Sequence, residues 1–503
     1  MLPISKRVFS AESVRSLDRI AIQEYGIEGY ELMLRAGKIA FKILRSEFPD
    51  AKHWLIFCGS GNNAGDGYVI AALALKNNIE ISVIALSDPN QLSGDAKLAY
   101  KDYSKINGTF VLQSTKISDL PKDCDLIIDA LLGTGVNRNL KGSYSSAVEL
   151  INSMNLPIAA VDIPSGLNSN TGQVLGNAVY ASLTISFVGL KKGFFLMNGP
   201  DHIGELFFDD LSIPSQVYET IHPDLKIFDQ ADSIQFLTRR SRVTHKSDCG
   251  HVLVVGGNVS MGGAVRLAGE AALRSGAGLV SVATKPENIS ALLTGRPELM
   301  CHGITSDNNL QSMLEKADVI SIGPGLGQDE WAHSLWSQVK NTNLPLVVDA
   351  DALNLLAEEP YKRDNWVLTP HPGEAARLLG VRSQDIQADR IAAIKEITSL
   401  YGGITLLKGH ATLISSSKDF PWMIKAGNPG MSTAGMGDVL TGIISALIAG
   451  NLKISSDLEK LSGVVATAAW IHAEISDRKV NVNGERSLIA SDLFDGLKEI
   501  LNP

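Results

Sequence analysis

The sequence predicts an α/β protein of two domains in series, each built on a parallel sheet covered by helices. The chain of 503 residues is too long for one hydrophobic core. Both halves alternate short β-branched apolar runs, which end in Gly or Asp, with longer Ala- and Leu-rich segments, as in parallel sheets whose strands are joined by helices. Residues 211–236 carry Pro214 and Pro223 and show no helix or strand rhythm, so we expect domains over residues 1–222 and 223–503.

The expected elements follow one another in a regular order. Ser10 is placed to cap a helix over residues 14–25, and a second helix is expected over residues 30–48, before Pro49. These two helices could also serve a subunit contact, so a homo-oligomer is allowed. The expected strands span residues 54–58, 81–86, 126–129, 158–161 and 183–188 in the first half, and 252–255, 279–283, 319–322, 346–348, 366–368 and 405–407 in the second.

Composition and charge exclude several classes of protein. A net charge of −9 argues against a general nucleic-acid binder. The four cysteines show no metal-type spacing and indicate reduced thiols. No apolar run is long enough to cross a bilayer, and the first residues lack the apolar core of a signal peptide. We therefore expect a cytoplasmic protein that binds neither nucleic acid nor a membrane.

A glycine-rich loop follows the first expected strand of the N-terminal half. Residues 59–67, GSGNNAGDG, match a loose G-x-G-x-x-A dinucleotide fingerprint, which by itself would suggest a dehydrogenase. Asn62, Asn63 and Asp66 are more polar than a pyrophosphate loop requires, and they favour a loop that also holds a cation or orients polar ligand groups. The alternative is that these side chains only satisfy the geometry of a turn.

Two carboxylates in the first half each end an expected strand. Because the carboxyl ends of parallel strands face the ligand crevice of a doubly wound sheet, Asp129 and Asp162 are expected to lie beside the glycine-rich loop. A lone Asp at a strand end is more often a helix cap, but two of them beside two glycine loops indicate a site. Lys191 and Lys192 follow a fifth strand and are expected to add positive charge for a phosphate group.

The most distinctive stretch lies in the second half, at residues 428–442, NPGMSTAGMGDVLTG. Gly435 and Gly437 allow backbone N–H groups to face an anion at the start of an apolar helix, and Asp438 could act as a base there. The alternative is a helix start capped by Asp438 alone.

Other strand ends of the second half are expected to converge on the same edge. Lys408 is a natural partner for a phosphate group. His371 lies between two prolines, and a rigid backbone there favours a site residue over a mobile surface histidine, although a satisfied loop histidine is the alternative.

The motifs of the first half resemble those of the NAD(P)H-hydrate epimerases over nearly all of residues 1–220. They are residues 62–67, Asp129 with the 133–135 turn, and residues 162–166, DIPSG. The resemblance implies a Rossmann-like doubly wound sheet, a substrate hydrated on its nicotinamide ring whose R and S forms are interconverted, a proton handled by Asp162, and a potassium ion. The potassium ligands it implies are Asn63, Asp129 and Ser165, and the substrate-binding residues are Asn62, Asn63, Ala64, Gly65, Asp66, Gly133, Thr134, Gly135, Val136, Asn137, Arg138, Asn139 and Asp162.

The motifs of the second half resemble those of the ADP/ATP-dependent NAD(P)H-hydrate dehydratases over about 240–495. This resemblance implies a ribokinase-like α/β/α domain, ADP as co-substrate with Mg²⁺, and NAD(P)HX as the ligand that is dehydrated. An epimerase followed by this domain is the order of the bifunctional nicotinamide-nucleotide repair enzymes. The implied contacts with the hydrate are Ala264, Gly327, His371 and Asp438, and those with the nucleotide are Lys408, Gly409, His410, Ala411, Thr412 and Gly437.

The resemblance also implies a mechanism and leaves one rival. Asp438 would deprotonate the ring hydroxyl, phosphoryl transfer from ADP would make it a leaving group, and elimination would restore the dihydropyridine. A ribokinase-like kinase for a vitamin precursor or a sugar would share this turn and this base, so it stays open for the second half. An epimerase-like first half, however, has no obvious use beside such a kinase.

Overall fold

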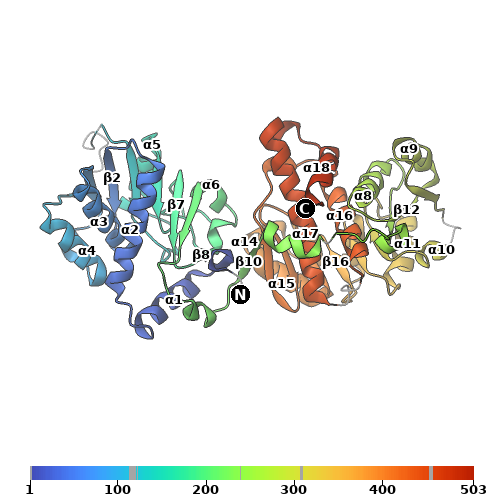
Figure 1. The fold of residues 1–503 in the computed structure, drawn as a ribbon, viewed down its shortest axis with the longest axis horizontal. Helices are drawn as coiled ribbons and strands as arrows, with labels where there is room; N and C mark the ends of the chain where they lie inside the picture. The colour runs from blue at the N-terminus through green and yellow to red at the C-terminus, as the bar shows by residue number, and fades with distance from the viewer. Residues whose placement is uncertain are drawn as a thin grey trace. The chain divides into compact units, whose positions relative to one another are not determined.

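The computed structural model divides the chain into two compact units, Met1–Leu225 and Lys226–Pro503 (Figure 1). It describes residues 3–112, 121, 123–237, 239–305, 310–452 and 457–502. Both units are α/β, which confirms the predicted fold class. Residues 211–236 show no helix or strand rhythm in the sequence, but they contain β10 (Leu225–Phe228) and α7 (Gln230–Ser233).

Unit 1 contains a parallel sheet in the order β4-β3-β2-β5-β6-β7-β9. From the centre of the sheet outward, the strands follow one another as β2, β3 and β4 on one side and as β5, β6, β7 and β9 on the other. The strand order therefore reverses between β2 and β5. In a doubly wound sheet, ligands bind outside the carboxyl ends of the strands at this switch point. The strands of this sheet are β2 (His53–Cys58), β3 (Glu80–Ala85), β4 (Val111–Leu112), β5 (Leu126–Ala130), β6 (Ile158–Val161), β7 (Leu183–Phe187) and β9 (Glu205–Asp209). Two more strands of the unit, β1 (Arg7–Phe9) and β8 (Leu190–Lys191), pair with each other outside it.

Helices cover both faces of the sheet in unit 1. Alternate residues of β2 point to opposite faces: Trp54 and Ile56 pack in the core under α1 to α4, whereas Leu55 and Phe57 pack in the core with α5. All of β2 is buried, as its unbroken apolar run predicts for a central parallel strand. The helices are α1 (Ala11–Gln23), which Ser10 caps as expected, α2 (Gly29–Glu47), α3 (Asn62–Lys76), α4 (Gly94–Lys105), α5 (Ser143–Ser153) and α6 (Gly199–Ile203).

Unit 2 contributes the strand order β13-β12-β11-β14-β15-β16-β17-β18-β19-β10. The strands from β13 to β17 are parallel, but β18 is antiparallel to both β17 and β19. The expectation of a purely parallel sheet is therefore wrong here. Residues 408–411 join β17 to β18, and a parallel crossover needs a dozen or more residues. The strands are β11 (His251–Val255), β12 (Leu279–Thr284), β13 (Met300–Gly303), β14 (Val319–Ile322), β15 (Leu346–Val348), β16 (Trp366–Leu368), β17 (Ile404–Leu407), β18 (Thr412–Ser416) and β19 (Asp419–Ile424).

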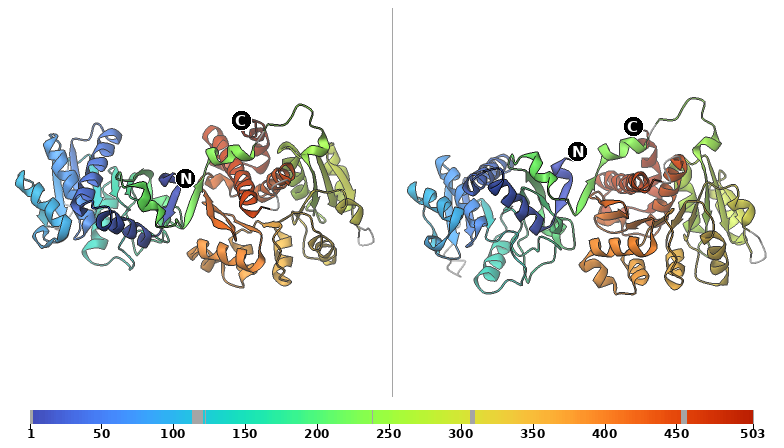
Figure 2. Two further views of the ribbon diagram at one scale, coloured as in Figure 1. Left: turned by 60° about the horizontal axis from the view of Figure 1, so that its bottom comes forward. Right: turned by 90° about the horizontal axis from the view of Figure 1, so that it is seen from below.

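Helices also lie on both faces of the sheet in unit 2 (Figure 2), where the red C-terminal helices are on the opposite side from the orange ones. Of these, α16 is buried along almost its whole length and packs against α8 and α17 in one hydrophobic core. The helices are α7, α8 (Gly262–Arg274), α9 (Ile289–Gly295), α10 (Gln311–Leu314), α11 (Glu330–Lys340), α12 (Asp351–Glu358), α13 (Pro372–Leu379), α14 (Ser383–Ala388), α15 (Arg390–Tyr401), α16 (Met436–Gly450), α17 (Leu458–Asn483) and α18 (Leu493–Ile500).

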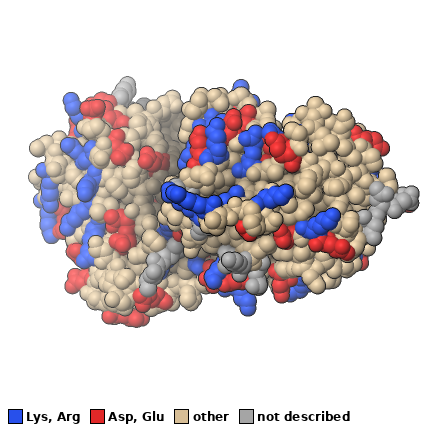
Figure 3. All heavy atoms as spheres, turned by 45° about the vertical axis from the view of Figure 1, so that its right-hand side comes forward, with Lys and Arg blue, Asp and Glu red and all other residues tan. Residues whose placement is uncertain are grey.

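The expected strands are all present, each within one residue of its expected ends. In the part of the chain that the structure describes, none of the helices has the length and apolar character needed to span a bilayer. On the face drawn in Figure 3, acidic and basic side chains are interspersed, as expected for a chain without a broad basic surface.

Unit 1 should fold by itself, and Asp224 should matter for its stability. Asp224 accepts a hydrogen bond from the Ser10 N–H at 2.9 Å, pairs with Lys192 at 3.3 Å, and donates its own N–H to the Val8 carbonyl. Hydrogen bonds of this kind contribute about 1 kcal/mol or more. Fragment 1–224 is therefore expected to melt about 2–4 °C above fragment 1–222 in a circular-dichroism scan. Fragment 1–224 with Asp224→Ala should lose this advantage, and equal melting temperatures for the two parent fragments would contradict the prediction.

Candidate active sites

Unit 1 holds a cavity of about 1120 Å³ at the switch point of its sheet. The loop after β2, the start of α3, the loop after β5, and parts of α1 and α2 line it. The topology thus brings together most of the residues that sequence reasoning proposed for this half. Those that line the cavity are Asn62, Asn63, Asp66, Gly133, Thr134, Gly135, Val136, Asn137, Arg138, Asn139 and Asp162.

Two of the proposed substrate-binding residues lie elsewhere. Ala64 is fully buried, and a Cβ on Gly65 would lie 2.5 Å from the Met33 sulfur, so both pack toward the neighbouring helices and not into the cavity. The physical reason is that α3 already begins at Asn62. With 3.6 residues per turn, Asn62, Asn63 and Asp66 can face one side while the two residues between them turn away from it.

Asp162 is held by a buried lysine. Lys191 is 0% exposed, forms an ion pair with Asp162, and also donates to the Ser186 hydroxyl at 2.9 Å and the Phe187 carbonyl at 3.1 Å. The expectation that Lys191 serves a phosphate group is therefore wrong, because its three donors are already used inside the protein. Asp162 itself has a φ of +67°. Non-glycine residues seldom adopt this left-handed conformation outside turns and functional sites.

Two further carboxyl groups, Asp18 of α1 and Asp66 of α3, line the cavity beside this ion pair. Burial, followed by the negative charge of Asp162, raises the pKa of Asp66 well above its usual value. Burial also raises the pKa of Asp18 to about 7, although Lys191 partly opposes the shift. One buried lysine thus faces three carboxyl groups, and we expect part of this acidic set to be protonated at neutral pH.

Of the residues proposed for potassium, Ser165 bonds to Asp129, and Asn63 and Ser165 both contact the Leu132 carbonyl. Asp129 is fully buried and accepts hydrogen bonds from the Ser165 hydroxyl and the Ser165 N–H, both at 2.7 Å. Asn63 donates to the Leu132 carbonyl at 3.0 Å, while its buried Oδ1 has no hydrogen-bond partner within the described part of the chain. Burial raises the pKa of Asp129 to about 6. An unpaired buried amide oxygen and a buried carboxyl group are both oxygen donors of the kind that a hard cation such as potassium takes.

The site of unit 2 begins where α16 starts. Gly435 has a φ of +88°, a left-handed conformation that favours glycine, and Asp438 lies in the first turn of the helix that follows. A Cβ on Gly437 would lie 3.4 Å from the Lys408 Nζ. The predicted anion-binding turn and the predicted phosphate partner are therefore adjacent, although they lie on different elements.

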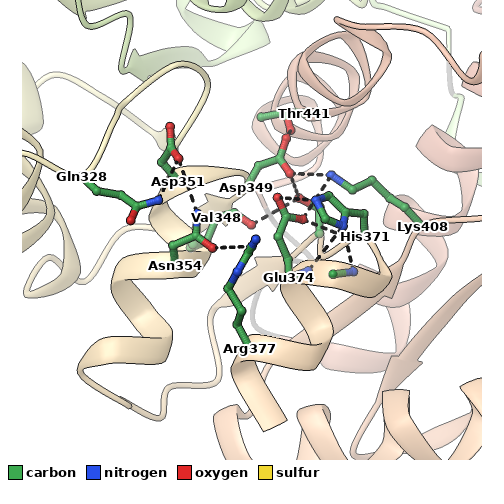
Figure 4. Close-up of polar contacts among 12 residues, drawn as sticks. Gln328, Val348, Asp349, Asp351, Asn354, His371, Glu374, Arg377, Lys408 and Thr441 are labelled. Atoms are coloured by element: carbon green, nitrogen blue, oxygen red, sulfur yellow. Dashed lines mark hydrogen bonds and ion pairs between the residues drawn. The ribbon is translucent and has the colours of Figure 1, made fainter. Parts of the chain in front are cut away.

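A hydrogen-bond network behind this turn centres on Asp349, at the end of β15 (Figure 4). Its carboxylate is 1% exposed and accepts from the Lys408 ammonium, the Thr369 hydroxyl and the Thr441 hydroxyl, each at 2.8 Å. Burial alone would raise the pKa of Asp349, but the charge of Lys408 and these hydrogen bonds keep it below its usual value. Asp349 thus stays ionised and fixes Lys408 at the edge of the sheet.

The same charges act on Asp438. Burial and the nearby negative charge of Asp349 raise the pKa of Asp438 to about 7, while Lys408 opposes the shift. A carboxylate with a pKa near the working pH is suited to accept a proton from a substrate hydroxyl.

His371 has a structural role that sequence reasoning treated as the alternative. Its Nδ1 accepts hydrogen bonds from the N–H groups of Gly373 and Glu374, and its own N–H donates to the Glu374 side chain, so it caps α13. Burial and the charge of Lys408 lower the pKa of His371. A neutral ring accepting at Nδ1 carries its proton on Nε2, which lies 3.4 Å from the Glu374 Oε1.

The other proposed contacts with the hydrate are Ala264, in the first turn of α8, and Gly327, in the loop after β14. A Cβ on Gly325 would lie 3.2 Å from the Ala264 Cβ, and the Gly327 N–H donates to Asp351 at 2.8 Å. Figure 4 shows Asp351 in a second chain of contacts, with Gln328 and Asn354, beside the Asp349 network.

The proposed nucleotide segment forms the loop that joins β17 to β18. His410 is exposed, Ala411 is buried with a φ of +51°, and Thr412 is the first residue of β18. Gly409 has a φ of +141°, again in the region that glycine tolerates best.

Sequence reasoning missed several residues of the two sites. Asp349 follows an expected strand directly, and sequence reasoning placed that strand end at the converging edge of the second half without giving Asp349 a role. Asp18 interrupts the buried face that Leu17 and Ala21 form on α1, which is an unusual place for a charge. The pairing of Lys191 with Asp162 had no local signal.

Comparisons with known proteins cover both units. One family model, described as YjeF-related protein N-terminus, matches residues 29–193, and another, described as NAD(P)H-hydrate dehydratase, matches residues 252–499. A ribokinase-like superfamily protein from Enterococcus faecalis, known from a crystal structure, is 28% identical, with a TM-score of 0.50 over 56% of this chain and 98% of its own.

Two curated relatives match from end to end. The bifunctional NAD(P)H-hydrate repair enzyme Nnr of Coxiella burnetii is 42% identical over 99% of this chain and 99% of its own length. The enzyme of the same name from Escherichia coli is 44% identical over 99% of this chain and 95% of its own length. With both units matched in the same order, the chain belongs to the family of bifunctional NAD(P)H-hydrate repair enzymes.

Proposed function

We propose that the chain repairs hydrated nicotinamide cofactors in two steps. Unit 1 interconverts the R and S forms of NAD(P)HX, and unit 2 dehydrates the S form to NAD(P)H with ADP, giving AMP and phosphate. The observation that carries this proposal is that one chain holds two strand-end sites of different chemistry. One offers a paired carboxylate in a large cavity, and the other offers a helix-start anion turn with a lysine and a base.

In unit 1, Asp162 is the group that moves the proton. Epimerisation needs reversible breaking and re-forming of one C–O bond, which a single positioned acid/base group can assist without redox change. Lys191 fixes the direction of the Asp162 carboxylate through their ion pair. Asn63, Asp129 and Ser165 would hold potassium, which would supply positive charge that orients the substrate.

In unit 2, Asp438 takes the proton of the ring hydroxyl, whose oxygen then bonds to the β-phosphorus of ADP as AMP leaves. Phosphate then leaves as the C–O bond of this ester breaks, the ring loses a proton from the adjacent carbon, and the dihydropyridine is restored. Backbone N–H groups of the 435–437 turn stabilise charge on the phosphoryl group, and Lys408 contacts it. Mg²⁺ enters as part of the ADP complex, because it usually binds through substrate phosphates.

The direct test is the recovery of NADH absorbance from hydrated NADH. The full chain should convert both epimers to NADH when ADP is present, and should interconvert them without releasing NADH when ADP is absent. ATP in place of ADP tests the nucleotide preference. If the chain instead phosphorylated a sugar or a vitamin precursor and released no NADH, the kinase alternative would replace the proposal for unit 2.

Asp438→Asn is expected to slow dehydration by about 10²–10⁴-fold, because it removes one positioned base, and to leave ADP binding and epimerisation intact. Since the base acts in its ionised form and its pKa is about 7, kcat/KM for dehydration should rise with pH up to about 7 and level off above it. The variant should lack this rise. Turnover near that of the wild type at saturating ADP would show that Asp438 is not the base.

Asp162→Ala is expected to leave the S hydrate consumed while the R hydrate accumulates, as followed by chromatography of the two epimers. Lys191→Met should slow epimerisation in the same way, because the carboxylate loses its partner. Lys192→Met is the matched control, since Lys192 pairs with Asp224 and not with Asp162. Clearance of the R hydrate by Asp162→Ala faster than its spontaneous epimerisation would rule out this role.

Replacing potassium by lithium is expected to slow epimerisation alone, because the proposed ligands all lie in unit 1. In Asn63→Ala, which lacks the unpaired amide oxygen, epimerisation should be slow in either salt. A wild-type epimerisation rate that is indifferent to the cation, or an equal effect on dehydration, would count against a potassium site in unit 1.

Self-association and a cytoplasmic location stay predictions. Size-exclusion chromatography with light scattering would test the first.

A further inference from the structure

Arg390, the first residue of α15, is buried beneath the loop that joins β17 to β18. Its side chain is 4% exposed. The guanidinium donates to the carbonyl of His410, to that of Leu407 at 3.2 Å and to that of Lys408 at 3.3 Å. All three acceptors belong to the segment proposed to contact the nucleotide or to the residue directly before it.

This arginine carries a buried charge without a carboxylate beside it. Among the described residues, no ion pair includes Arg390, and its Nε has no hydrogen-bond partner. Burial lowers its pKa to about 10, so it remains charged at neutral pH. Burying a charge costs free energy unless an opposite charge or good hydrogen bonds compensate it. The structure therefore keeps positive charge behind this loop with only backbone carbonyls to balance it.

The hydrogen bonds also determine how the loop presents its backbone. No described peptide bond is cis, and in a trans peptide the C=O and the following N–H point in opposite directions. Because the carbonyls of Lys408 and His410 turn toward Arg390, the N–H groups of Gly409 and Ala411 point away from it. A Cβ on Gly409 would lie only 3.0 Å from the Arg390 Nη2, so a larger residue at position 409 would crowd the guanidinium.

We propose that Arg390 is a positioning residue for the nucleotide: it turns the loop carbonyls inward, directs the Gly409 and Ala411 N–H groups toward ADP, and supplies positive charge that the phosphates of ADP neutralise. This inference rests on the proposed function of unit 2. Arg390 contacts the loop and not the substrate, so its effect should appear in nucleotide affinity more than in the chemical step.

The experiment measures ADP binding by calorimetry, KM and kcat for ADP in dehydration, and epimerisation as an internal control of folding, all with the full chain. Arg390→Met should raise both the Kd and the KM for ADP at least about tenfold, or about 1.4 kcal/mol, with kcat changed much less. Arg390→Lys should lie between Arg390→Met and the wild type, because an ammonium keeps the charge but cannot span three carbonyls. Gly409→Ala, which pushes on the guanidinium, should weaken ADP binding in the same direction.

Arg363→Met is the matched control. Arg363 also donates to backbone carbonyls, those of Lys340 at 3.1 Å and Leu344 at 2.8 Å, but it lies beside the amino ends of β15 and β16. The Arg363→Met variant should leave the KM for ADP within about twofold of the wild type. If unit 2 does not fold in the Arg390→Met chain, the Kd and KM for ADP of Arg390→Lys and Gly409→Ala test the inference instead.

Wild-type ADP affinity in a folded Arg390→Met chain, or in both remaining variants, would overturn the inference, and so would an equal KM change in Arg363→Met. A wild-type chain that neither binds ADP nor dehydrates the hydrate would instead refute the proposed function itself.

Discussion

The common direction of the parallel strands is the constraint on which both sites depend. Because parallel strands all end at the same edge, each delivers the residue that follows it to one place. In unit 1, Asp129 lies near the carboxyl end of β5 and Asp162 follows β6, and in unit 2 Asp349 and Lys408 follow β15 and β17. A sheet of alternating direction would send half of these side chains to the opposite edge. The antiparallel β18 does not break the rule, since the short β17–β18 loop keeps residues 408–411 at that edge.

Each unit places a lysine in an ion pair with a carboxylate at its strand-end site. Lys191 is paired with Asp162, and Lys408 with Asp349. Removing one partner of such a buried pair usually costs about 3–5 kcal/mol, because the other charge is left uncompensated. The pairs differ in accessibility: Lys191 is fully buried, whereas the Lys408 side chain is 21% exposed. This difference agrees with an internal positioning role for Lys191 and with phosphate contact for Lys408.

The opposite edges of the two sheets share a second arrangement. In unit 1 the ring of His53 hydrogen-bonds to the Ser82 hydroxyl at 2.8 Å, and Asp125 accepts from the His53 N–H. In unit 2, His251, Ser281 and Asp318 make the same contacts at 2.8 Å each. Polar side chains thus tie three neighbouring strands together at their amino ends, where sites are not expected, and the carboxyl ends remain available for ligands.

The sequence by itself determined the order and type of the main elements, because apolar runs and caps are local signals. It also predicted that Asp438 lies at a helix start after a glycine turn, and that Asp162 lies beside the glycine-rich loop that follows β2. It did not predict that Ala64 and Gly65 turn inward, or that residues 412–424 form antiparallel strands. Only the tertiary structure paired Lys191 with Asp162 and placed Arg390 under the nucleotide loop. Such contacts join residues from different elements, and they depend on strand order and burial, which local periodicity does not encode.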